Sequence, residues 1–368
     1  MKRKILLLLA GLLAITYYTR AQSVSIPFDF ARWDTAGAVM IKDSYQGKDG
    51  IVLNSGMIYC KDVDFLDGTI EFDMSVQQKR YFPGMGFRIQ DRNNYEEFYV
   101  RPHQSGNPDA NQYTPVFNGQ GGWQLYYGTD YSFPFSYKFD QWHHIKLVVH
   151  GITAEIYIDD MQKPIIKVPE LKRGWKAGKI GFSTPGVPVR LANLQYSITT
   201  GPAPAPIPVP ANGTRGLVTE YHVSNGISGR LFGDKYLLTP DIKKALTWKT
   251  YPTEYTGVIN LAKYTELNEN SNTVVAKLII ESDKEQVKPI QFGFSDYVLV
   301  YLNDKALYFG KDNFMSRDYR FLGTIGYFDV LPLSLKKGTN ELWFVLSENF
   351  GGWGMQAKFE NMEGIKLK

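Results

Sequence analysis

The chain has 368 residues, a formal net charge of +4 and a single cysteine, and 14% of its residues are aromatic. This length suits two domains of ordinary size better than one. Four of the basic residues lie in an expected export signal, so the rest of the chain is close to neutral: Lys2, Arg3, Lys4 and Arg20. A neutral chain without a stripe of Lys and Arg lacks the electrostatic pattern of a nucleic-acid-binding protein, which indicates a neutral partner.

The first residues have the layout of a cleavable secretory signal. A basic start precedes the short apolar run 5–15, and the small residue Ala21 ends the segment. The run is too short for a permanent membrane-spanning helix, and no later stretch approaches that length. We therefore expect residues 1–21 to be removed and the protein to be exported to the periplasm or the extracellular space; an uncleaved anchor is the alternative. Because Cys60 is the only cysteine, no internal disulfide is expected.

The segment 22–200 contains short strands separated by clusters of Gly, Asn, Asp and Pro. Apolar residues occupy every second position in three stretches: 69–76, 145–149 and 154–158. This alternation predicts strands that bury one face and expose the other. Since no stretch has a long helical period, the pattern predicts an antiparallel β-sandwich.

A proline-rich stretch divides the chain. Prolines alternate with other residues from Pro202 to Pro210, which prevents regular hydrogen bonding and favours an extended polyproline II spacer. We therefore predict a Pro/Ala-rich linker over 201–214 between one domain at 22–200 and a second at 215–368.

The second domain has the same character as the first. Strands are expected at 273–280, 297–301 and 342–346. Two hairpin turns are expected at 303–305 and 337–340, and one short helix at 240–250. The predicted fold class is all-β, with two antiparallel jelly-roll sandwiches.

Two sets of residues in the first domain resemble a known fold. The paired stretches 141–149 and 154–159, with 178–183 and 189–196, resemble the concanavalin-A-like, laminin-G-type jelly rolls. The tract 84–102 is similar to the branch called 3-keto-disaccharide hydrolase domains. This resemblance implies a jelly roll concerned with sugars, but the fold also serves lectins, glycosidases and adhesion modules.

The second domain resembles the galactose-binding-like sandwiches that accompany many sugar-active enzymes. The resemblance is carried by 292–303, 335–342 and 350–355. Both families imply that a structural calcium ion can be present, for which we assign no ligands. No His or Cys spacing typical of a metal site occurs, and no cofactor is predicted.

One predicted strand carries the principal candidate site. Alternation over 97–103 turns Phe98 and Val100 inward and leaves four polar side chains on the opposite face: Glu97, Tyr99, Arg101 and His103. Arg88 and Gln90 on the preceding strand would join them if the two strands pair. Planar hydrogen-bonding groups beside an aromatic ring suit a saccharide. The alternative is an ordinary solvated sheet face.

Two loop residues extend this site. Gln112 follows in the long polar loop that begins at His103, and Trp123 comes after a run of glycines. A tryptophan on a glycine turn can stack on a sugar ring, whereas the alternative is a tryptophan that closes the end of the sandwich.

Catalysis has less support in the sequence. Glycoside hydrolysis usually needs two carboxyl groups that face one bond. The candidates are Asp91, Glu97 and Asp109, but the laminarinase-type acidic signature is absent. The sequence therefore favours a secreted protein that binds oligo- or polysaccharides. The alternatives are a hydrolase or lyase of the 3-keto-disaccharide hydrolase type, and a protein-adhesion module.

Overall fold

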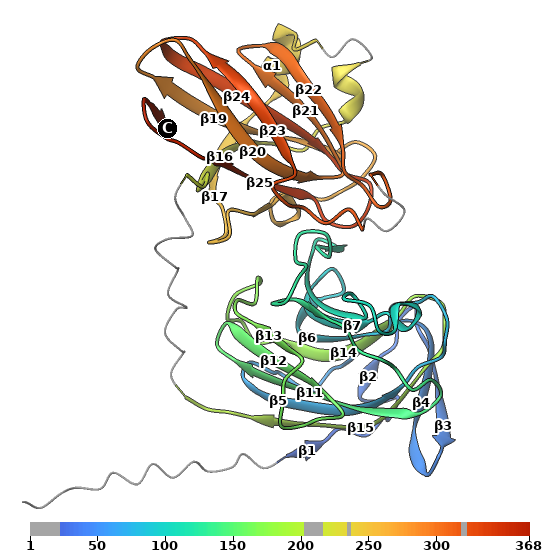
Figure 1. The fold of residues 1–368 in the computed structure, drawn as a ribbon. Helices are drawn as coiled ribbons and strands as arrows, with labels where there is room; N and C mark the ends of the chain where they lie inside the picture. Colours follow the sequence, from blue (N-terminus) through green and yellow to red (C-terminus); the bar gives the residue numbers. More distant parts are fainter. Residues whose placement is uncertain (1–22, 202–215, 234–236, 318–321) are drawn as a thin grey trace, which may run out of the picture.

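The computed structural model describes residues 23–201, 216–233, 237–317 and 322–368. The expected signal and nearly all of the expected linker lie outside these residues. Two antiparallel β-sandwiches stand one against the other (Figure 1), so the predicted all-β fold class is confirmed. Strands β1 to β15 pair among themselves within the described residues, and so do β16 to β26.

The first sandwich has two layers that share one long strand, β4 (Lys48–Cys60). The front layer runs from its edge to β4 through β10 (Ser132–Phe133), β8 (Asn111–Phe117), β7 (Asn94–Val100), β6 (Gly84–Asp91) and β14 (Lys179–Thr184). The back layer continues from β4 through β15 (Val189–Ile198), β5 (Gly68–Ser75), β11 (Trp142–His150), β12 (Thr153–Ile158) and β13 (Ile166–Val168). The short elements are β1 (Val24–Ser25), β2 (Trp33–Asp34), β3 (Val39–Tyr45), β9 (Gln120–Gly121) and η1 (Pro102–Gln104).

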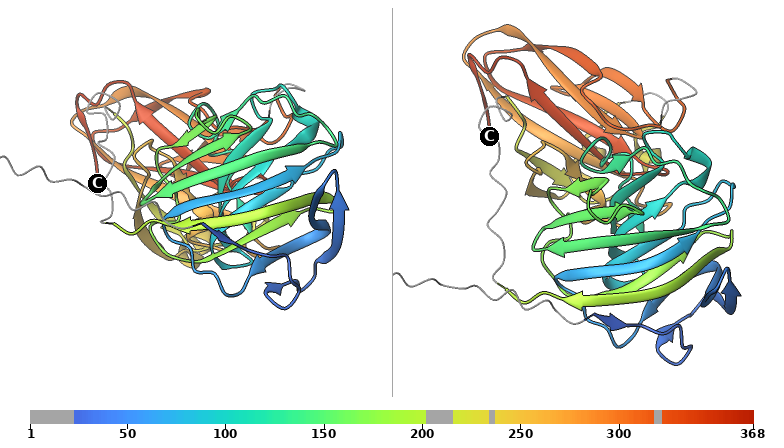
Figure 2. Two further views of the ribbon diagram at one scale, coloured as in Figure 1. Left: turned by 90° about the horizontal axis from the view of Figure 1, so that it is seen from below. Right: turned by 60° about the horizontal axis from the view of Figure 1, so that its bottom comes forward.

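The alternation of β5 explains how the layers pack. Ile70 and Phe72 are fully buried between the layers, as their spacing predicts, and the Phe72 ring meets Phe182 edge-on at 5.0 Å. Each such buried apolar side chain contributes about 1.5–3 kcal/mol. The back layer lies on the side of this sandwich away from the second one, and the front layer faces it (Figures 1 and 2).

The second sandwich also has two layers. One sheet contains β17 (Trp248–Pro252), β16 (Glu220–Ser224), β19 (Thr273–Ser282), β24 (Gly338–Ser347), β21 (Tyr297–Leu302) and β22 (Lys305–Lys311), with β26 (Ile365–Leu367) beside β19. The other contains β18 (Ile259–Asn260), β25 (Gly354–Phe359), β20 (Gln286–Ser295) and β23 (Asp329–Leu335). Three short helical turns complete it: η2 (Gly229–Phe232), α1 (Pro240–Ala245) and η3 (Leu261–Lys263).

Of the two expected hairpins, one is confirmed and one is wrong. Asn303 and Asp304 both have positive φ and connect the paired strands β21 and β22, as a two-residue hairpin turn requires. The turn before β24, in contrast, joins strands of opposite sheets. β23 pairs with β20, whereas β24 pairs with β19 and β21, so this turn is a crossover between the layers.

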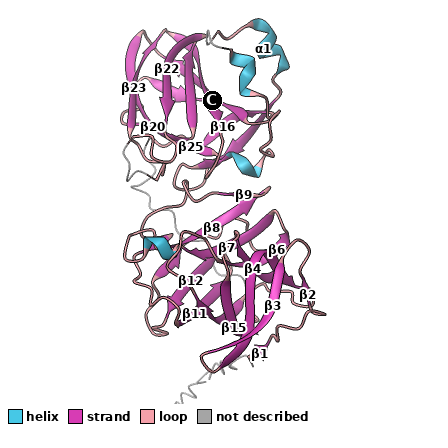
Figure 3. Ribbon diagram, turned by 90° about the vertical axis from the view of Figure 1, so that its right-hand side faces the viewer, coloured by secondary structure: helices cyan, strands magenta, loops and turns pink. Residues whose placement is uncertain are grey.

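The expected helix is shorter than the sequence pattern suggested. α1 begins after the Thr239 cap, whose side chain accepts the Ile242 backbone N–H, and it ends at Ala245. Residues 248–252 form β17 instead, since aromatic and β-branched residues there favour a strand. α1 lies on the outside of the second sandwich (Figure 3). No helix in the described part of the chain is long and apolar enough to cross a membrane.

A loop of the first sandwich is anchored in the second. The Gln124 backbone N–H donates to the Gly351 carbonyl at 3.0 Å, and its carbonyl accepts from the Ile325 N–H at 3.0 Å. The Gln124 side chain accepts from the Ser295 hydroxyl at 2.9 Å and is completely buried. The two sandwiches are therefore held in one relative position at this loop.

An ion pair reinforces the contact between the sandwiches. The Lys172 ammonium lies 2.9 Å from Glu254, and the Tyr126 hydroxyl donates to the same carboxylate at 2.6 Å. Lys263 adds a second cation at 2.7 Å. These partners outweigh the burial of Glu254 and hold its pKa below the ordinary value.

Candidate functional site

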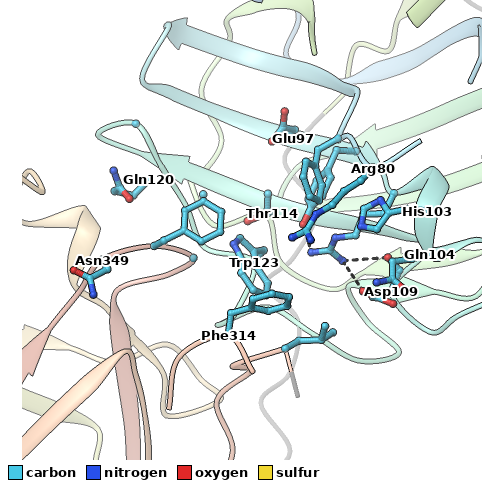
Figure 4. A pocket seen from close by; sticks show the side chains of 18 residues that line it. Arg80, Glu97, His103, Gln104, Asp109, Thr114, Gln120, Trp123, Phe314 and Asn349 are labelled. Carbon is cyan, nitrogen blue, oxygen red and sulfur yellow. Dashed lines mark hydrogen bonds and ion pairs between the residues drawn. The ribbon is translucent and has the colours of Figure 1, made fainter. Parts of the chain in front are cut away.

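A cavity of about 440 Å³ lies between the two sandwiches (Figure 4). The first sandwich contributes its front layer and the loops on either side of it, through Arg80, Phe82, Glu97, Tyr99, Arg101, His103, Gln104, Asp109, Thr114, Gly119, Gln120, Gly121 and Trp123. The second contributes the loop residues Phe314, Leu322, Asn349, Phe350 and Gly351. The cavity has walls from both domains, so neither sandwich forms it alone.

Aromatic and guanidinium groups alternate along one wall of the cavity. The Arg101 guanidinium lies 4.9 Å from the Tyr99 ring centre and 5.5 Å from that of Trp123. Trp123 meets Phe314 edge-on at 6.5 Å, and the Arg80 guanidinium lies 5.8 Å from the Phe314 ring. Flat rings and planar donors therefore face one space, as the sequence indicated for Tyr99, Arg101 and Trp123.

Gln112 positions this wall from beneath. Its side-chain carbonyl accepts the Tyr99 hydroxyl at 2.9 Å, and its amide donates to the Trp123 carbonyl at 2.8 Å and to the Tyr126 carbonyl. Gln112 is completely buried and does not line the cavity. It is a positioning residue, not the ligand contact that the sequence suggested.

Glu97 enters the cavity from β7. Gly84 on the paired strand makes room for it, because a Cβ there would lie 2.6 Å from the carboxyl group. Its one hydrogen-bond partner in the described residues is the Ser183 hydroxyl, at 3.0 Å. Loss of hydration outweighs this bond and raises the pKa of Glu97 to about 7. The side chain can thus give or take a proton near neutral pH.

His103 lies among cations at the other side of the cavity. Its ring meets Phe82 edge-on at 5.3 Å, and its Nδ1 is buried without a partner in the described residues. Burial, followed by the charges of Arg80 and Arg101, lowers the pKa of His103 to about 4. The imidazole is therefore neutral at physiological pH, and the field around it is positive.

Asp109 is tied to Arg101. The Arg101 guanidinium lies 3.7 Å from the Asp109 carboxylate and donates to its backbone carbonyl at 3.1 Å. It also donates to the Tyr99 hydroxyl. Both charged side chains are nearly buried, so Arg101 neutralises Asp109 as well as lining the cavity. This pairing removes Asp109 as a free carboxylate.

The placement predicted for Arg88 is wrong. Arg88 is 2% exposed, and its guanidinium pairs with Asp67 at 2.8 Å and donates to the Gly151 carbonyl at 2.6 Å, away from the cavity. Its φ of 49° marks an irregularity where the registers of β6 with β7 and β14 shift. An irregularity of this kind ends strict alternation, so the face predicted from alternation stops short of Arg88.

Gln90 and Asp91 also lie outside the cavity lining. The Gln90 amide donates to the Ala177 carbonyl at 2.7 Å, beside β14. The Asp91 carboxylate accepts from the Asn93 N–H at 2.8 Å and from the Asn94 amide, in the tight turn between β6 and β7. Asp91 therefore stabilises a turn, and it does not face Glu97 across the cavity.

The second domain contributes an aromatic side chain to the cavity that the sequence did not indicate. Phe350 is 67% exposed and lies 6.0 Å from Trp123, ring centre to ring centre. A signal existed, because Phe350 precedes two glycines just as Trp123 follows two. Gly351 and Gly352 both have positive φ and allow the loop to approach Trp123 closely. Trp353, which follows these glycines, is completely buried in the second core and has a structural role.

In the described part of the chain, no group of three or more His, Cys, Asp and Glu side chains is arranged to hold a metal ion. The structural calcium implied by the family resemblances stays a prediction without ligands.

Comparison with protein-family models finds no match, and comparison with curated proteins finds none. Several solved structures are similar. The carbohydrate-binding module CBM66 from Bacillus subtilis is 17% identical with a TM-score of 0.36, over 45% of this chain and 95% of that one. A β-glucanase from Bacillus licheniformis is 12% identical with a TM-score of 0.34, over 49% of this chain and 100% of that one.

A third similar structure is described as a putative glycosyl hydrolase from Parabacteroides distasonis. It is 14% identical with a TM-score of 0.32, over 47% of this chain and 90% of that one. Each of the three likenesses covers less than half of this chain, so the function has to be argued from the chain's own residues.

Proposed function

We propose that this chain is an exported carbohydrate-binding protein that holds an oligosaccharide, or one end of a polysaccharide, between its two sandwiches. The observation that carries the proposal is the composite cavity, whose lining combines the rings of Trp123, Phe314 and Phe350 with the guanidinium groups of Arg80 and Arg101. Aromatic faces suit the apolar face of a pyranose ring, and guanidinium groups suit its hydroxyl groups.

The dimensions and the rigidity of the cavity support this proposal. Its volume of about 440 Å³ lies within the roughly 300–1,000 Å³ of small-molecule sites. The buried anchor at Gln124 and the Lys172–Glu254 ion pair hold the two walls in place before a ligand arrives. A preformed site loses little conformational entropy on binding.

Calorimetric titration of the complete chain against a panel of oligosaccharides tests the proposal. Trp123→Ala should weaken binding at least tenfold, because one stacking surface of the site is lost. Trp175→Ala is the matched control, since Trp175 is 43% exposed and does not line the cavity. Equal loss in both variants, or no binding by the parent protein to any member of the panel, would overturn the proposal.

Glu97 favours a second candidate function, hydrolysis or lysis of glycosides of the 3-keto-disaccharide hydrolase type. A carboxyl group with a pKa of about 7 inside a ligand-sized cavity suits a general acid or base. A two-carboxylate mechanism has less support, because Asp109 pairs with Arg101 and Asp91 lies outside the cavity.

Product release distinguishes these two functions. If the chain is an enzyme, the complete protein releases reducing or unsaturated sugars, and Glu97→Gln abolishes that release while binding persists. Asp91→Asn should leave the rate unchanged. Binding without any product at micromolar protein would reject the enzymatic candidate and leave the carbohydrate-binding proposal intact.

A further inference from the structure

The charges that line the cavity point to the class of saccharide. We infer that the cavity selects acidic saccharides, and that Arg80 receives the oxyanion of the sugar, either a uronic-acid carboxylate or a sulfate ester. This inference rests on the proposed carbohydrate binding and goes beyond it, because a neutral sugar would need no uncompensated cation.

The acidic and basic side chains of the cavity do not cancel in pairs. Arg101 and Asp109 lie 3.7 Å apart and neutralise each other. Arg80 and Glu97 are the remaining charged groups in the lining, and no contact joins them among the described residues. The cavity therefore contains one cation without a carboxylate partner.

The geometry of Arg80 leaves its hydrogen-bonding edge open. Its guanidinium lies over the Phe314 ring at 5.8 Å, and it forms no ion pair or hydrogen bond with any described residue. Stacking on a ring occupies the face of a guanidinium but leaves its in-plane donors available. Those donors match the two oxygens of a carboxylate or a sulfate in a bidentate arrangement.

Two neighbouring groups support an anionic ligand. Loss of hydration raises the pKa of Glu97 to about 7, so below neutral pH this carboxyl group is largely protonated and does not repel an anion. Burial is the main cause of the lowered pKa of His103, about 4, and the charges of Arg80 and Arg101 add to it. An uncharged imidazole beside two cations indicates a local positive potential, which attracts anions.

Matched saccharide pairs test the inference. The complete chain is titrated with neutral disaccharides, with the corresponding uronic-acid forms and with sulfated forms, at low salt and at pH 6. The acidic member of the preferred pair should bind about tenfold more tightly than the neutral one, as expected for one charge-assisted contact. Added salt should reduce this preference.

Two variants that each lose one positive charge, Arg80→Gln and Arg230→Gln, locate the effect. Arg80→Gln should weaken binding of the acidic saccharide about tenfold, and by more than it weakens binding of the neutral one. Arg80→Lys should restore part of the preference, since it keeps the charge and loses the bidentate fork. Arg230→Gln is the control, because Arg230 is an exposed arginine of the second sandwich outside the cavity lining.

The outcomes separate the two proposals. The inference is supported if the protein prefers uronic acids or sulfated sugars and if Arg80→Gln removes that preference. The preferred member then identifies the source of the oxyanion. Saccharide binding in which neutral members bind as tightly as acidic ones, or a preference that survives Arg80→Gln, overturns the inference and leaves the carbohydrate-binding function standing. No binding to any member overturns both.

Discussion

Asp73 and Glu97 are carboxyl groups on the two layers of the first sandwich, and their surroundings differ. Asp73 on the back layer contacts three donors: His144 at 2.8 Å, Lys48 at 2.7 Å and Asn193 at 2.6 Å. Glu97 on the front layer has only Ser183 among the described residues. Partners lower the pKa of Asp73 against the effect of its burial, whereas burial raises that of Glu97.

This difference separates a structural carboxylate from a functional one. A carboxylate whose partners are all supplied by the fold has no capacity left for a ligand. One that is desolvated beside a cavity, with a single partner, keeps hydrogen-bonding capacity at a cost in stability. We therefore assign the Asp73 cluster to stability and the Glu97 side of the sandwich to ligand binding.

Asp73→Asn should produce the largest loss of stability. The carboxylate is 4% exposed, and its removal leaves Lys48 without its counter-charge and His144 with Glu71 alone. We expect the free energy of unfolding to fall by about 3 kcal/mol at pH 7, measured by urea denaturation. Glu97→Gln, the same chemical change on the other layer, should not lower it at pH 7, because the amide has no charge whose burial costs hydration.

The pH dependence of the same pair checks this assignment. Because the pKa of Asp73 is lowered in the folded state, its contribution is present above its unfolded pKa and is lost as the pH falls through the folded one. Wild type and Asp73→Asn should therefore converge in stability as the pH falls from 3.8 through the folded pKa. A difference that stays constant over the whole acid range below pH 3.8 would contradict the role of the charge.

Gly351→Ala should cause the next largest loss of stability, through the loop that lines the cavity. Its φ is +119°, and a Cβ there would lie 2.1 Å from the Gln124 side-chain oxygen and 2.8 Å from the Trp123 ring. We expect a loss of about 2 kcal/mol in unfolding free energy, together with weaker ligand binding. Gly186→Ala is the control: its φ is +76° with open space around it, so only backbone strain should appear. Equal effects in both variants would reject a contact role for Gly351.

Glu97 should make the protein less stable as the pH rises. Its pKa increases from an ordinary value of 4.5 to about 7 on folding, so the folded state holds a proton that the unfolded state has released. Stability is therefore lost between about pH 4.5 and 7. Asp312, whose pKa is also raised to about 7, contributes to the same window. His144, whose pKa is raised above its ordinary value of 6.5 by Asp73, contributes a loss that begins only above that pH.

The difference between wild type and Glu97→Gln isolates this carboxyl group. Thermal melting from pH 5 to 8 should show a steeper decline for wild type than for the variant. Ser183→Ala, which removes the one donor to the carboxylate, should move the decline to higher pH. Parallel curves for wild type and Glu97→Gln would mean that Glu97 is hydrated in solution.

Sequence alone predicted the fold class and much of one wall of the site. Alternation in 69–76 predicted the buried face of β5, and alternation in 97–100 placed Glu97 and Tyr99 on the cavity side. Arg101 and His103 also line the cavity, but the strand expected through 103 ends at Val100 and His103 lies in η1. The prediction from alternation failed at Arg88, where an irregular strand register reverses the direction of the side chain. It also missed Phe350 and Phe314, because contacts between domains leave no periodic pattern in either segment.

The smallest effect on stability is expected at Asp91, a third carboxylate, which contacts neither the Asp73 cluster nor the cavity. It is exposed and accepts hydrogen bonds from Asn93 and Asn94 within its own turn. Asp91→Ala should cost about 0.5 kcal/mol of unfolding free energy and leave saccharide affinity unchanged in the same titration that reports on Trp123. A loss of affinity without a loss of stability would show that the ligand extends along β6 to this turn, which would place a second subsite beyond the cavity.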